Sequence, residues 1–593
     1  MHQISNLRVE NFKSIIEAEF PLAAYTPLVG YNNAGKTNIL NAVSWLIKKS
    51  SLPAADFNDP EKLVSVSAKI VGIDEDVLAA LGDTHRPKIE PLVINKVLHI
   101  KREQSEPDAK AKDMPLQVLK QTDAGDMVWA VNPAGIDAAI SQLFPEPVFI
   151  GAMENATEDV AKFGTSTTIG KLIKEIITPI TETHAAPVND ALADIASKLS
   201  ADSPDKDQNL INLDAQIQNE LAKFFPGVRA KTHIPTPEFG DFLKGATIKI
   251  FEDEFANPNG RDAGSFGHGA QRSVQIALVK CLSEIKRNTD VGAGRTTLLL
   301  IDEPELYLHP QAVELVRASL SRLSVEGYQV LFSTHSPAMI SREDAPNTLL
   351  IRRNKEAGTR AYPRIRDAVQ ATIDGAQSQS ETLFTLTNAA KVLFSERVVL
   401  AEGATEQRLL PEVFCTEIGS TLDENKIGLV ALGGVENVPN AMKVLRAMGI
   451  PTKAVVDLDF AFRAAIKQNM IPADHAGVVG CLSILTRLEA EKKCTLSHGL
   501  PVNETNGTKA AAAYTMMANE PDAEAHIRSI HDHLKNEGIW CWCKGAIETH
   551  LDLSSKKPAA HLAFLTKLQD QNFRNGLPDY KEVQQMLAWL QAA

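Results

Sequence analysis

The stretch GYNNAGKT, from Gly30 to Thr37, fits the phosphate-loop pattern G-x-x-x-x-G-K-[ST] at every position. An apolar stretch, YTPLVG, runs into it, and a segment with helical spacing of apolar residues follows it. In that context the glycines let backbone N–H groups surround phosphate oxygens, Lys36 reaches the β- and γ-phosphates, and Thr37 binds Mg²⁺. A chance glycine turn would not need this strand and helix. The ATP-binding residues expected in this loop are Gly30, Asn32, Asn33, Gly35, Lys36 and Thr37.

A second motif, TTLLLIDEPELYLHP, reads as a buried strand that ends in Asp302 and Glu303. We expect Asp302 to hold the Mg²⁺ of the nucleotide, directly or through water, and Glu303 to polarise the attacking water. An acidic pair can also simply end a strand and cap the next helix. The phosphate loop earlier in the chain favours the catalytic interpretation.

Two further segments belong with the phosphate loop and the strand that ends in Asp302 and Glu303. GSFGHGAQRS places small residues and Gln271 at the start of a helix, and LFSTHSP is a strand that ends at His335. The order of the four motifs resembles ABC-type ATPases, and the long gap after the phosphate loop resembles the split heads of the SMC and RecF groups. In those proteins the signature helix faces the γ-phosphate of an opposite subunit. The resemblance implies that Gly267, Gly269 and Gln271 contact ATP across a dimer and that His335 senses the γ-phosphate.

The signature segment SFGHGAQ departs from the usual L-S-G-G-Q of these ATPases. The cross-subunit contact is therefore less firmly expected than nucleotide binding. By itself, His335 would more often be a strand-end histidine with satisfied hydrogen bonds, and only its place in the series makes it a candidate γ-phosphate sensor.

Acids also end strands in the C-terminal part of the chain. RVVLAEG delivers Glu402 to a strand tip, with Glu406 one helical turn later, and AVVDLDF delivers Asp457 and Asp459. Adjacent parallel strand ends would bring these carboxylates together, which is costly unless a cation neutralises them. Mg²⁺ or Mn²⁺ held there can activate water and stabilise both oxygens of a phosphodiester displacement. The alternative is a set of solvated acids at strand ends.

The pattern E-G-x-x-E followed by D-x-D resembles the Toprim domain of topoisomerases, primases and certain nucleases. A later segment, GIWCWCKGAIETHL, adds Lys544 and Glu548. Lys544 beside a metal cluster could stabilise the transition state, or it could be a lysine that extends to solvent at a helix start.

An ABC-type ATPase fused to a C-terminal Toprim domain resembles the OLD (overcoming lysogenization defect) nuclease family along essentially the whole chain. The family implies metal-dependent DNA cleavage, often in defence against phage, with a helical insertion for dimerisation. Some relatives act with a helicase-like partner or a retron. Carried over by position, Lys544 becomes the transition-state cation. The implied metal ligands are Glu402, Glu406, Asp457, Asp459 and Glu548.

We therefore predict an α/β protein with an ABC/SMC-like ATPase head, a helical dimerisation insertion and a C-terminal Toprim (Rossmann-like) α/β domain. The stretch from about Val64 to Leu98 reads as strands and short turns. The predicted parts are residues 1–167 (ATPase N-terminal lobe), 168–225 (helical insertion), 226–380 (ATPase C-terminal lobe) and 381–593 (Toprim domain).

Composition sets outer limits on function. The 593 residues carry a formal net charge of −13, which argues against a wholly basic coat for nucleic acid but allows a local basic groove. Six scattered cysteines suit a reducing compartment, and no apolar run approaches a membrane span. The expected location is the cytoplasm. Cys541 and Cys543 read as two same-face residues of a buried strand rather than metal ligands.

The predicted function is an ATP-hydrolysing, Mg²⁺- or Mn²⁺-dependent DNA endonuclease or nickase, as a homodimer or larger homo-oligomer and without a membrane partner. The main alternative is a DNA-binding structural or repair ATPase like RecF or SMC proteins, without nuclease activity. A topoisomerase would need a catalytic tyrosine, and Tyr514 and Tyr580 lie in no obvious DNA-binding module. A primase would need a template-binding element that the sequence does not display.

Overall fold

The structure is a computed structural model that falls into two compact units, each described separately below. Unit 1 comprises Met1–Tyr25 and Thr37–Thr334, and unit 2 comprises Thr26–Lys36 and His335–Ala593. The described residues are 2–122, 124–131, 135–152, 187, 190, 192–193, 195–225, 227–234, 249–251, 260–262, 265–288, 296–341, 343–372, 391–503, 507–577 and 579–592. The predicted boundaries near residues 167, 225 and 380 adjoin or fall in stretches outside these ranges, so they stay predictions.

Unit 1 contains an antiparallel group of strands and a parallel group. In sheet order the antiparallel strands are β7 (Met127–Val131), β6 (Gln117–Gln121), β5 (Val97–Gln104), β4 (Val64–Val71), β1 (Gln3–Phe12) and β2 (Ile15–Pro21). The parallel strands are β12 (Tyr328–Thr334), β11 (Thr297–Ile301) and β8 (Val148–Ile150). Every residue of β11 and β12 is buried, as expected for parallel strands covered on both faces.

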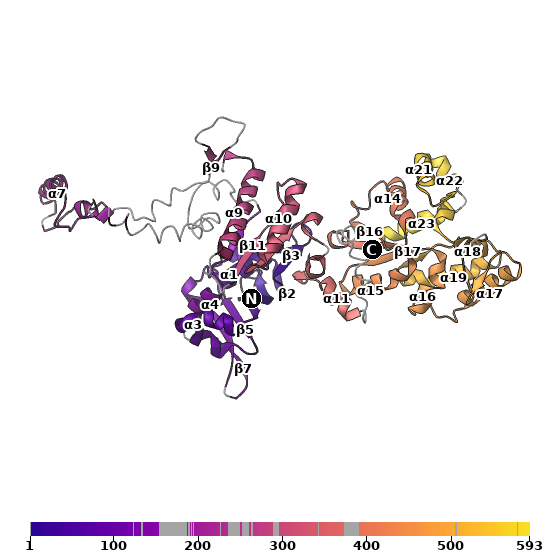
Figure 1. Cartoon of the computed structure of the whole chain (residues 1–593), viewed down its shortest axis with the longest axis horizontal. Helices are drawn as coiled ribbons and strands as arrows, with labels where there is room; N and C mark the ends of the chain where they lie inside the picture. The colour runs from indigo at the N-terminus through magenta and orange to yellow at the C-terminus, as the bar shows by residue number, and fades with distance from the viewer. Residues whose placement is uncertain are drawn as a thin grey trace. The chain divides into compact units, whose positions relative to one another are not determined.

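Helices surround these strands in Figure 1. The named α-helices of this unit are α1 (Lys36–Ile47, whose first residue belongs to unit 2), α2 (Glu75–Ala80), α3 (Gly82–Ile89), α4 (Ile136–Leu143), α7 (Gln208–Leu221), α9 (His268–Asn288) and α10 (Pro310–Leu323). Helices α2 and α3 show that the expectation of only strands and turns from Val64 to Leu98 was wrong. Asp74 caps α2 by accepting the Val77 N–H, and such caps start short polar helices that apolar periodicity does not reveal.

The predicted helical insertion is described only in part. The sequence predicts three helices there, IGKLIKEIITPI, VNDALADIASKL and LINLDAQIQNELAKFF, and the first lies outside the described residues. The last one is confirmed as α7, which has no buried residue. Its apolar side chains at Leu213 and Ile217 remain 43% and 40% exposed, and Phe224 just after the helix is 74% exposed.

Unit 2 joins a small strand group to an open parallel sheet. Strand β3 (Tyr25–Val29), which lies in this unit from Thr26, pairs in parallel with β13 (Leu349–Asn354), and β13 forms a hairpin with β14 (Gly358–Ala361). Helix α11 (Ile365–Thr372) follows the hairpin. The second sheet has the order β16 (Ile427–Ala431), β15 (Arg397–Ala401), β17 (Thr452–Val456) and β20 (Ile539–Cys541), all parallel.

Helices cover both faces of this second sheet (Figure 1). One core contains Leu400 and Val456 with residues of α15, α17 and α19, and the other contains Val399 and Val455 with residues of α14, α21 and α23. Alternating strand residues thus feed two opposite cores, as in a doubly wound fold. The helices are α14 (Ala404–Ile418), α15 (Val438–Ala447), α16 (Ala464–Lys467), α17 (Ala476–Ala490), α18 (Ala510–Ala518), α19 (Ala523–Asn536), α20 (Ile547–His550), α21 (Pro558–Lys567), α22 (Gln571–Gly576) and α23 (Tyr580–Gln591).

None of the helices in the described part of the chain combines the length and the apolar composition that a bilayer crossing requires.

Candidate functional site

Acidic side chains meet at the carboxyl edge of the parallel sheet in unit 2. Glu402 directly follows β15 and Asp457 directly follows the neighbouring strand β17. The Asp457 backbone N–H donates to Glu402 Oε2 over 3.3 Å, which fixes the two strand ends together. Parallel strands bring their carboxyl ends to one edge, which is where ligands bind in open α/β sheets.

Helices add further acids to the same edge. Glu406 lies in the first turn of α14 and is 4% exposed, and its Oε2 accepts the N–H of Gly403. Glu548 lies on α20, and its Oε1 accepts the Thr405 hydroxyl over 2.7 Å. Asp459 follows Asp457 in the 3₁₀ turn after β17 and lies 3.6 Å from Arg463.

Burial and mutual repulsion shift these carboxyl groups toward their protonated forms. Desolvation, reinforced by Asp459, raises the pKa of Glu402 to about 7. Desolvation also raises the pKa values of Glu406 and Asp459, and it raises that of Asp457, with help from Glu402, well above its ordinary value. Without a cation, the edge cannot hold all of these negative charges at neutral pH.

Two carboxylate oxygens at this edge are buried without a hydrogen-bond partner: Asp457 Oδ1 and Glu548 Oε2. Buried polar atoms are rarely left unpaired, and a cation that binds there is one of the ordinary explanations. The donor set is made of carboxylate oxygens, which suit hard divalent cations such as Mg²⁺ and Mn²⁺. The residues at this edge therefore fit a divalent metal.

The lysine at the acids is Lys556, which the sequence analysis missed. Its Nζ lies 3.2 Å from Glu548 Oε1 and 3.7 Å from Asp457 Oδ2. Burial opposes its charge, but Asp457 and Glu548 outweigh burial and raise the pKa of Lys556. Lys544, the predicted cation, instead donates to the Ala518 carbonyl over 3.3 Å. Nothing in the spacing of the segment SSKK marks Lys556, because it reaches the site from a loop after α20.

The predicted ATPase motifs also form specific contacts, first within unit 1. The Thr37 hydroxyl donates to both oxygens of Asp302, at 2.9 and 3.1 Å, and the Ser333 hydroxyl donates to Asp302 as well. Arg272 Nη2 binds the carbonyls of Asp302 and Glu303 at 2.8 and 2.9 Å. Glu303 has a φ of 49°, a left-handed conformation that is unusual for glutamate and is found mostly where function demands it.

Within unit 2, the Lys36 ammonium donates to the carbonyls of Gly30 and Tyr31 and lies 2.7 Å from Nε2 of His335. The ammonium can only donate, so Nε2 of His335 is the unprotonated nitrogen. A Cβ at Gly30 would lie 2.3 Å from the Ile351 carbonyl oxygen, so this position must be glycine. Asn33 and Gly35 take positive φ values of 64° and 98°, and the loop bends at these two residues.

The signature segment leads into α9. Gln271 is 2% exposed and its Nε2 donates to the Phe266 carbonyl over 2.7 Å. A Cβ at Gly269 would lie 2.8 Å from the Tyr307 carbonyl oxygen, so close packing explains this glycine. The predicted role of Gly267, Gly269 and Gln271 toward a second subunit stays a prediction.

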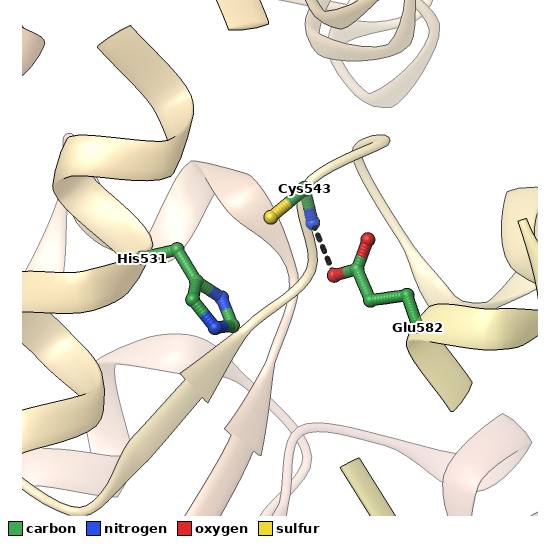
Figure 2. A group of neighbouring side chains, drawn as sticks. All are labelled: His531, Cys543 and Glu582. Carbon is green, nitrogen blue, oxygen red and sulfur yellow. Dashed lines mark hydrogen bonds between the residues drawn. The ribbon is translucent and has the colours of Figure 1, made fainter. Parts of the chain in front are cut away.

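His531, Cys543 and Glu582 form a second group with metal-ligand chemistry (Figure 2). One potential ligand atom from each lies within 4.8 Å of the others. However, His531 Nδ1 lies 2.8 Å from the Cys541 carbonyl, and Glu582 accepts the Cys543 N–H and lies 3.0 Å from His550 Nε2. Burial, with Glu582, raises the pKa of the Cys543 thiol, so it is protonated at neutral pH. Existing hydrogen bonds account for this group, which ties β20 to α19 and α23.

The tyrosines considered for a topoisomerase are buried rather than presented to a substrate. Tyr514 is 2% exposed and stacks on Phe462, and burial raises the pKa of Tyr514 to about 12. Tyr580 is 3% exposed and its hydroxyl donates to Glu417 over 3.1 Å. A nucleophile needs access and a lowered pKa, so neither tyrosine suits that role.

Family models match both halves of the chain. Residues 3–114 and 148–340 match the AAA ATPase domain, and residues 393–459 match the Toprim domain of overcoming lysogenization defect-like proteins. The second match includes Glu402, Glu406, Asp457 and Asp459. The predicted α/β class and the ATPase and Toprim parts are thereby confirmed.

Known proteins resemble the chain over most of its length. The OLD nuclease of Thermus scotoductus is 20% identical over 77% of this chain and 82% of its own length. A solved SMC head bound to the C-terminal winged-helix domain of ScpA covers 60% of this chain and 96% of its own, at 14% identity and a TM-score of 0.34. The Old nuclease of Escherichia phage P2 is 35% identical over 99% of this chain and 100% of its own length. By this full-length likeness and both domain matches, the chain belongs to the OLD nuclease family and is an ATPase and a nuclease that uses nucleotide and divalent metal.

Proposed function

We propose that the chain is an ATP-regulated DNA endonuclease or nickase whose cleavage site is the acidic edge of the Toprim sheet. One observation carries the proposal: Asp457 and Glu548 each keep a buried carboxylate oxygen unpaired beside a lysine. Mg²⁺ or Mn²⁺ is the proposed ion, because the ligands are all oxygens. When bound, the ion supplies an activated water and a clamp for the phosphate.

The chain's own residues prepare this chemistry. Glu402 and Asp457 would hold the ion, because their strands fix both carboxylates at one edge. Glu406, Asp459 and Glu548 complete the set, and the Thr405 hydroxyl orients Glu548. An arriving cation would take over the charges that now hold Lys556, which frees its ammonium for a phosphate oxygen of the substrate.

The nucleotide site would act as the regulator. Lys36 would bind the β- and γ-phosphates, Thr37 and Asp302 the Mg²⁺ of ATP, and Glu303 the attacking water, with His335 as γ-phosphate sensor. We further propose a cytoplasmic role in defence against phage, alone or with a helicase-like or retron partner. This part rests on the family resemblance, and a structural ATPase without cleavage is the alternative.

Separate variants should inactivate the two activities separately. Asp457→Asn should abolish plasmid cleavage but leave ATP hydrolysis near the parent rate, because it removes only a proposed metal ligand. Glu303→Gln should keep ATP binding and lower ATP turnover at least about a hundredfold, because the carboxylate that orients water is gone. Plasmid nicking and phosphate release on the same preparations test this. Full cleavage by Asp457→Asn would favour the structural ATPase.

The two lysines give a matched comparison. Lys556→Gln should slow cleavage by about a hundredfold or more, because it removes a cation from the phosphate site. Lys544→Gln should change cleavage by less than about threefold, because the ammonium of Lys544 binds the Ala518 carbonyl. The measurement is the initial nicking rate at saturating Mn²⁺. A larger loss of nicking rate in Lys544→Gln than in Lys556→Gln would indicate that Lys544, and not Lys556, is the cation at the phosphate.

The raised pKa of Glu402 predicts a stability change with pH. The folded metal-free protein binds a proton there up to about pH 7, whereas an unfolded glutamate releases it near 4.5. Stability should therefore fall as pH rises between these values, and the loss is complete above them. Glu402→Gln should raise the melting temperature in EDTA by about 2–4 °C at pH 8 and by less at pH 5.5.

A control variant for this experiment is Glu412→Gln, which removes an exposed carboxylate from the same helix, α14. It should leave the melting temperature unchanged at both pH values. In the parent, Mn²⁺ at pH 8 should raise the melting temperature, and Glu402→Gln should reduce that rise. An equal Mn²⁺ effect in all three proteins would contradict the metal site.

We also propose that α7 forms part of a homodimer or larger homo-oligomer interface. Support comes from the exposed apolar side chains of Leu213, Ile217 and Phe224, which follow helical spacing. The double variant Leu213→Glu, Ile217→Glu should dissociate the assembly in light scattering. The control Asn212→Glu, Gln216→Glu adds the same charges one position earlier on each turn and should leave the mass unchanged. Retention of the parental mass by both would place the interface elsewhere.

A further inference from the structure

A hollow of about 290 Å³ lies in unit 2, at the edge of the Toprim sheet opposite the acids. Its walls include Glu396 and Pro451, which directly precede β15 and β17. The acids Glu402 and Asp457 follow the far ends of the same strands, six residues away and therefore roughly 20 Å distant. The hollow is thus a separate place from the proposed cleavage site.

Guanidinium groups dominate the other wall. Arg352, Arg353 and Arg360 line the hollow from the hairpin of β13 and β14. Arg352 and Arg360 are directly opposite each other in the hairpin, an arrangement of like charges that weakens a strand pair. Within the described residues no carboxylate lies within ion-pair distance of these arginines, since Glu396 pairs with Lys426 over 2.5 Å.

The Arg352 side chain and the backbone of Arg353 are held in place before any ligand arrives. Arg352 donates to the Ser395 carbonyl over 2.7 Å, and its guanidinium lies 5.5 Å from the ring centre of Tyr31. The hydroxyl of Tyr31 donates to the Arg353 carbonyl over 2.6 Å and accepts the Arg353 N–H over 3.1 Å. These contacts fix the backbone of β13 at the hollow. Little conformational freedom would therefore be lost when a ligand binds.

A second tyrosine supports Arg360. The guanidinium lies 5.4 Å from the ring centre of Tyr362. Gly449 makes room for that ring, because a Cβ there would lie 2.4 Å from a ring carbon. The hollow is therefore a rigid, cationic recess with aromatic walls in a chain whose net charge is −13.

We propose that this recess binds the phosphate group of a nucleotide, either free or within a nucleic acid strand. Guanidinium groups match phosphate in geometry and charge, and an anion would relieve the repulsion between Arg352 and Arg360. The volume is at the small end of ligand sites, enough for a phosphate and part of its nucleoside. Tyrosine rings beside guanidinium groups are also the surfaces on which bases stack.

The test uses a fluorescent single-stranded oligonucleotide with a 5′-phosphate, in EDTA so that no cleavage occurs. Arg353→Gln and Arg360→Gln should each weaken binding about tenfold in fluorescence anisotropy. The control is Lys355→Gln, which removes one positive charge from the exposed turn of the same hairpin without touching the recess. It should change the affinity by less than about twofold.

A second arm separates the two sources of phosphate. AMP and inorganic phosphate are titrated by calorimetry into the Lys36→Ala variant, so that the phosphate loop does not contribute. Arginine-dependent binding of AMP without binding of the oligonucleotide identifies a free nucleotide, and arginine-dependent binding of the oligonucleotide identifies a strand; both support the recess. The proposal is overturned if no probe binds, or if Lys355→Gln weakens binding as much as the arginine variants. Melting curves of each variant verify that the fold is intact.

Discussion

Several buried carboxylates lie at one edge of a parallel sheet. Their mutual repulsion is the constraint on which the C-terminal half of this molecule depends. Desolvation raises the pKa values of Glu402, Glu406, Asp457 and Asp459. Such a cluster destabilises the metal-free fold and favours the binding of a cation. The surrounding structure tolerates it because the two strands are held by cores on both faces of the sheet. The fold thus keeps an unfavourable charge arrangement that is useful once metal is present.

In the metal-free state, Lys556 neutralises part of the negative charge of these carboxylates. It contacts Asp457 and Glu548 but leaves one oxygen of each unpaired. One ammonium on a flexible, exposed side chain can neutralise only part of the cluster. Under the proposed function, Lys556 would leave the acids when they bind a metal and would then be available to a phosphate of the substrate. A more buried and fully paired lysine could not take both positions.

Sequence patterns placed the acids that follow strands at one edge of a sheet, where the structure has Glu402 beside Asp457. Glu402, Glu406, Asp457 and Asp459 follow apolar strand runs, and strands deliver their last residues to a common edge, so spacing alone brings them together. The phosphate-loop motif was equally visible, because Gly30, Lys36 and Thr37 must lie at fixed spacing within one short loop to act together. The structure also brings Asp302 to Thr37 and His335 to Lys36, as the order of motifs had suggested.

Sequence patterns say less about side chains that come from loops. Lys544 lies in the short loop between β20 and α20, and its position suggested a site lysine, whereas in the structure its ammonium reaches the end of α18. Lys556 comes from a loop with no periodicity, so no pattern could favour it over its neighbour Lys557. The short helices α2 and α3 were missed because each buries only one or two apolar residues, Val77 and Leu78 in α2 and Ile89 in α3, too few to give a helical period.

The two ends of β15 and β17 adjoin side chains of opposite charge. These strands therefore connect the acidic edge to the arginine recess within unit 2. The carboxyl ends carry the acids, whereas the amino ends adjoin the arginines of the β13–β14 hairpin. The Tyr31 hydroxyl, from the phosphate loop itself, binds the backbone of Arg353, and the neighbouring Arg352 binds the Ser395 carbonyl just before β15. A shift in the loop at Tyr31 would therefore act first on the arginine recess and then on the strand that carries Glu402. These hydrogen bonds connect the phosphate loop to the segment just before the strand that carries Glu402, and the proposed regulation by ATP would use this route.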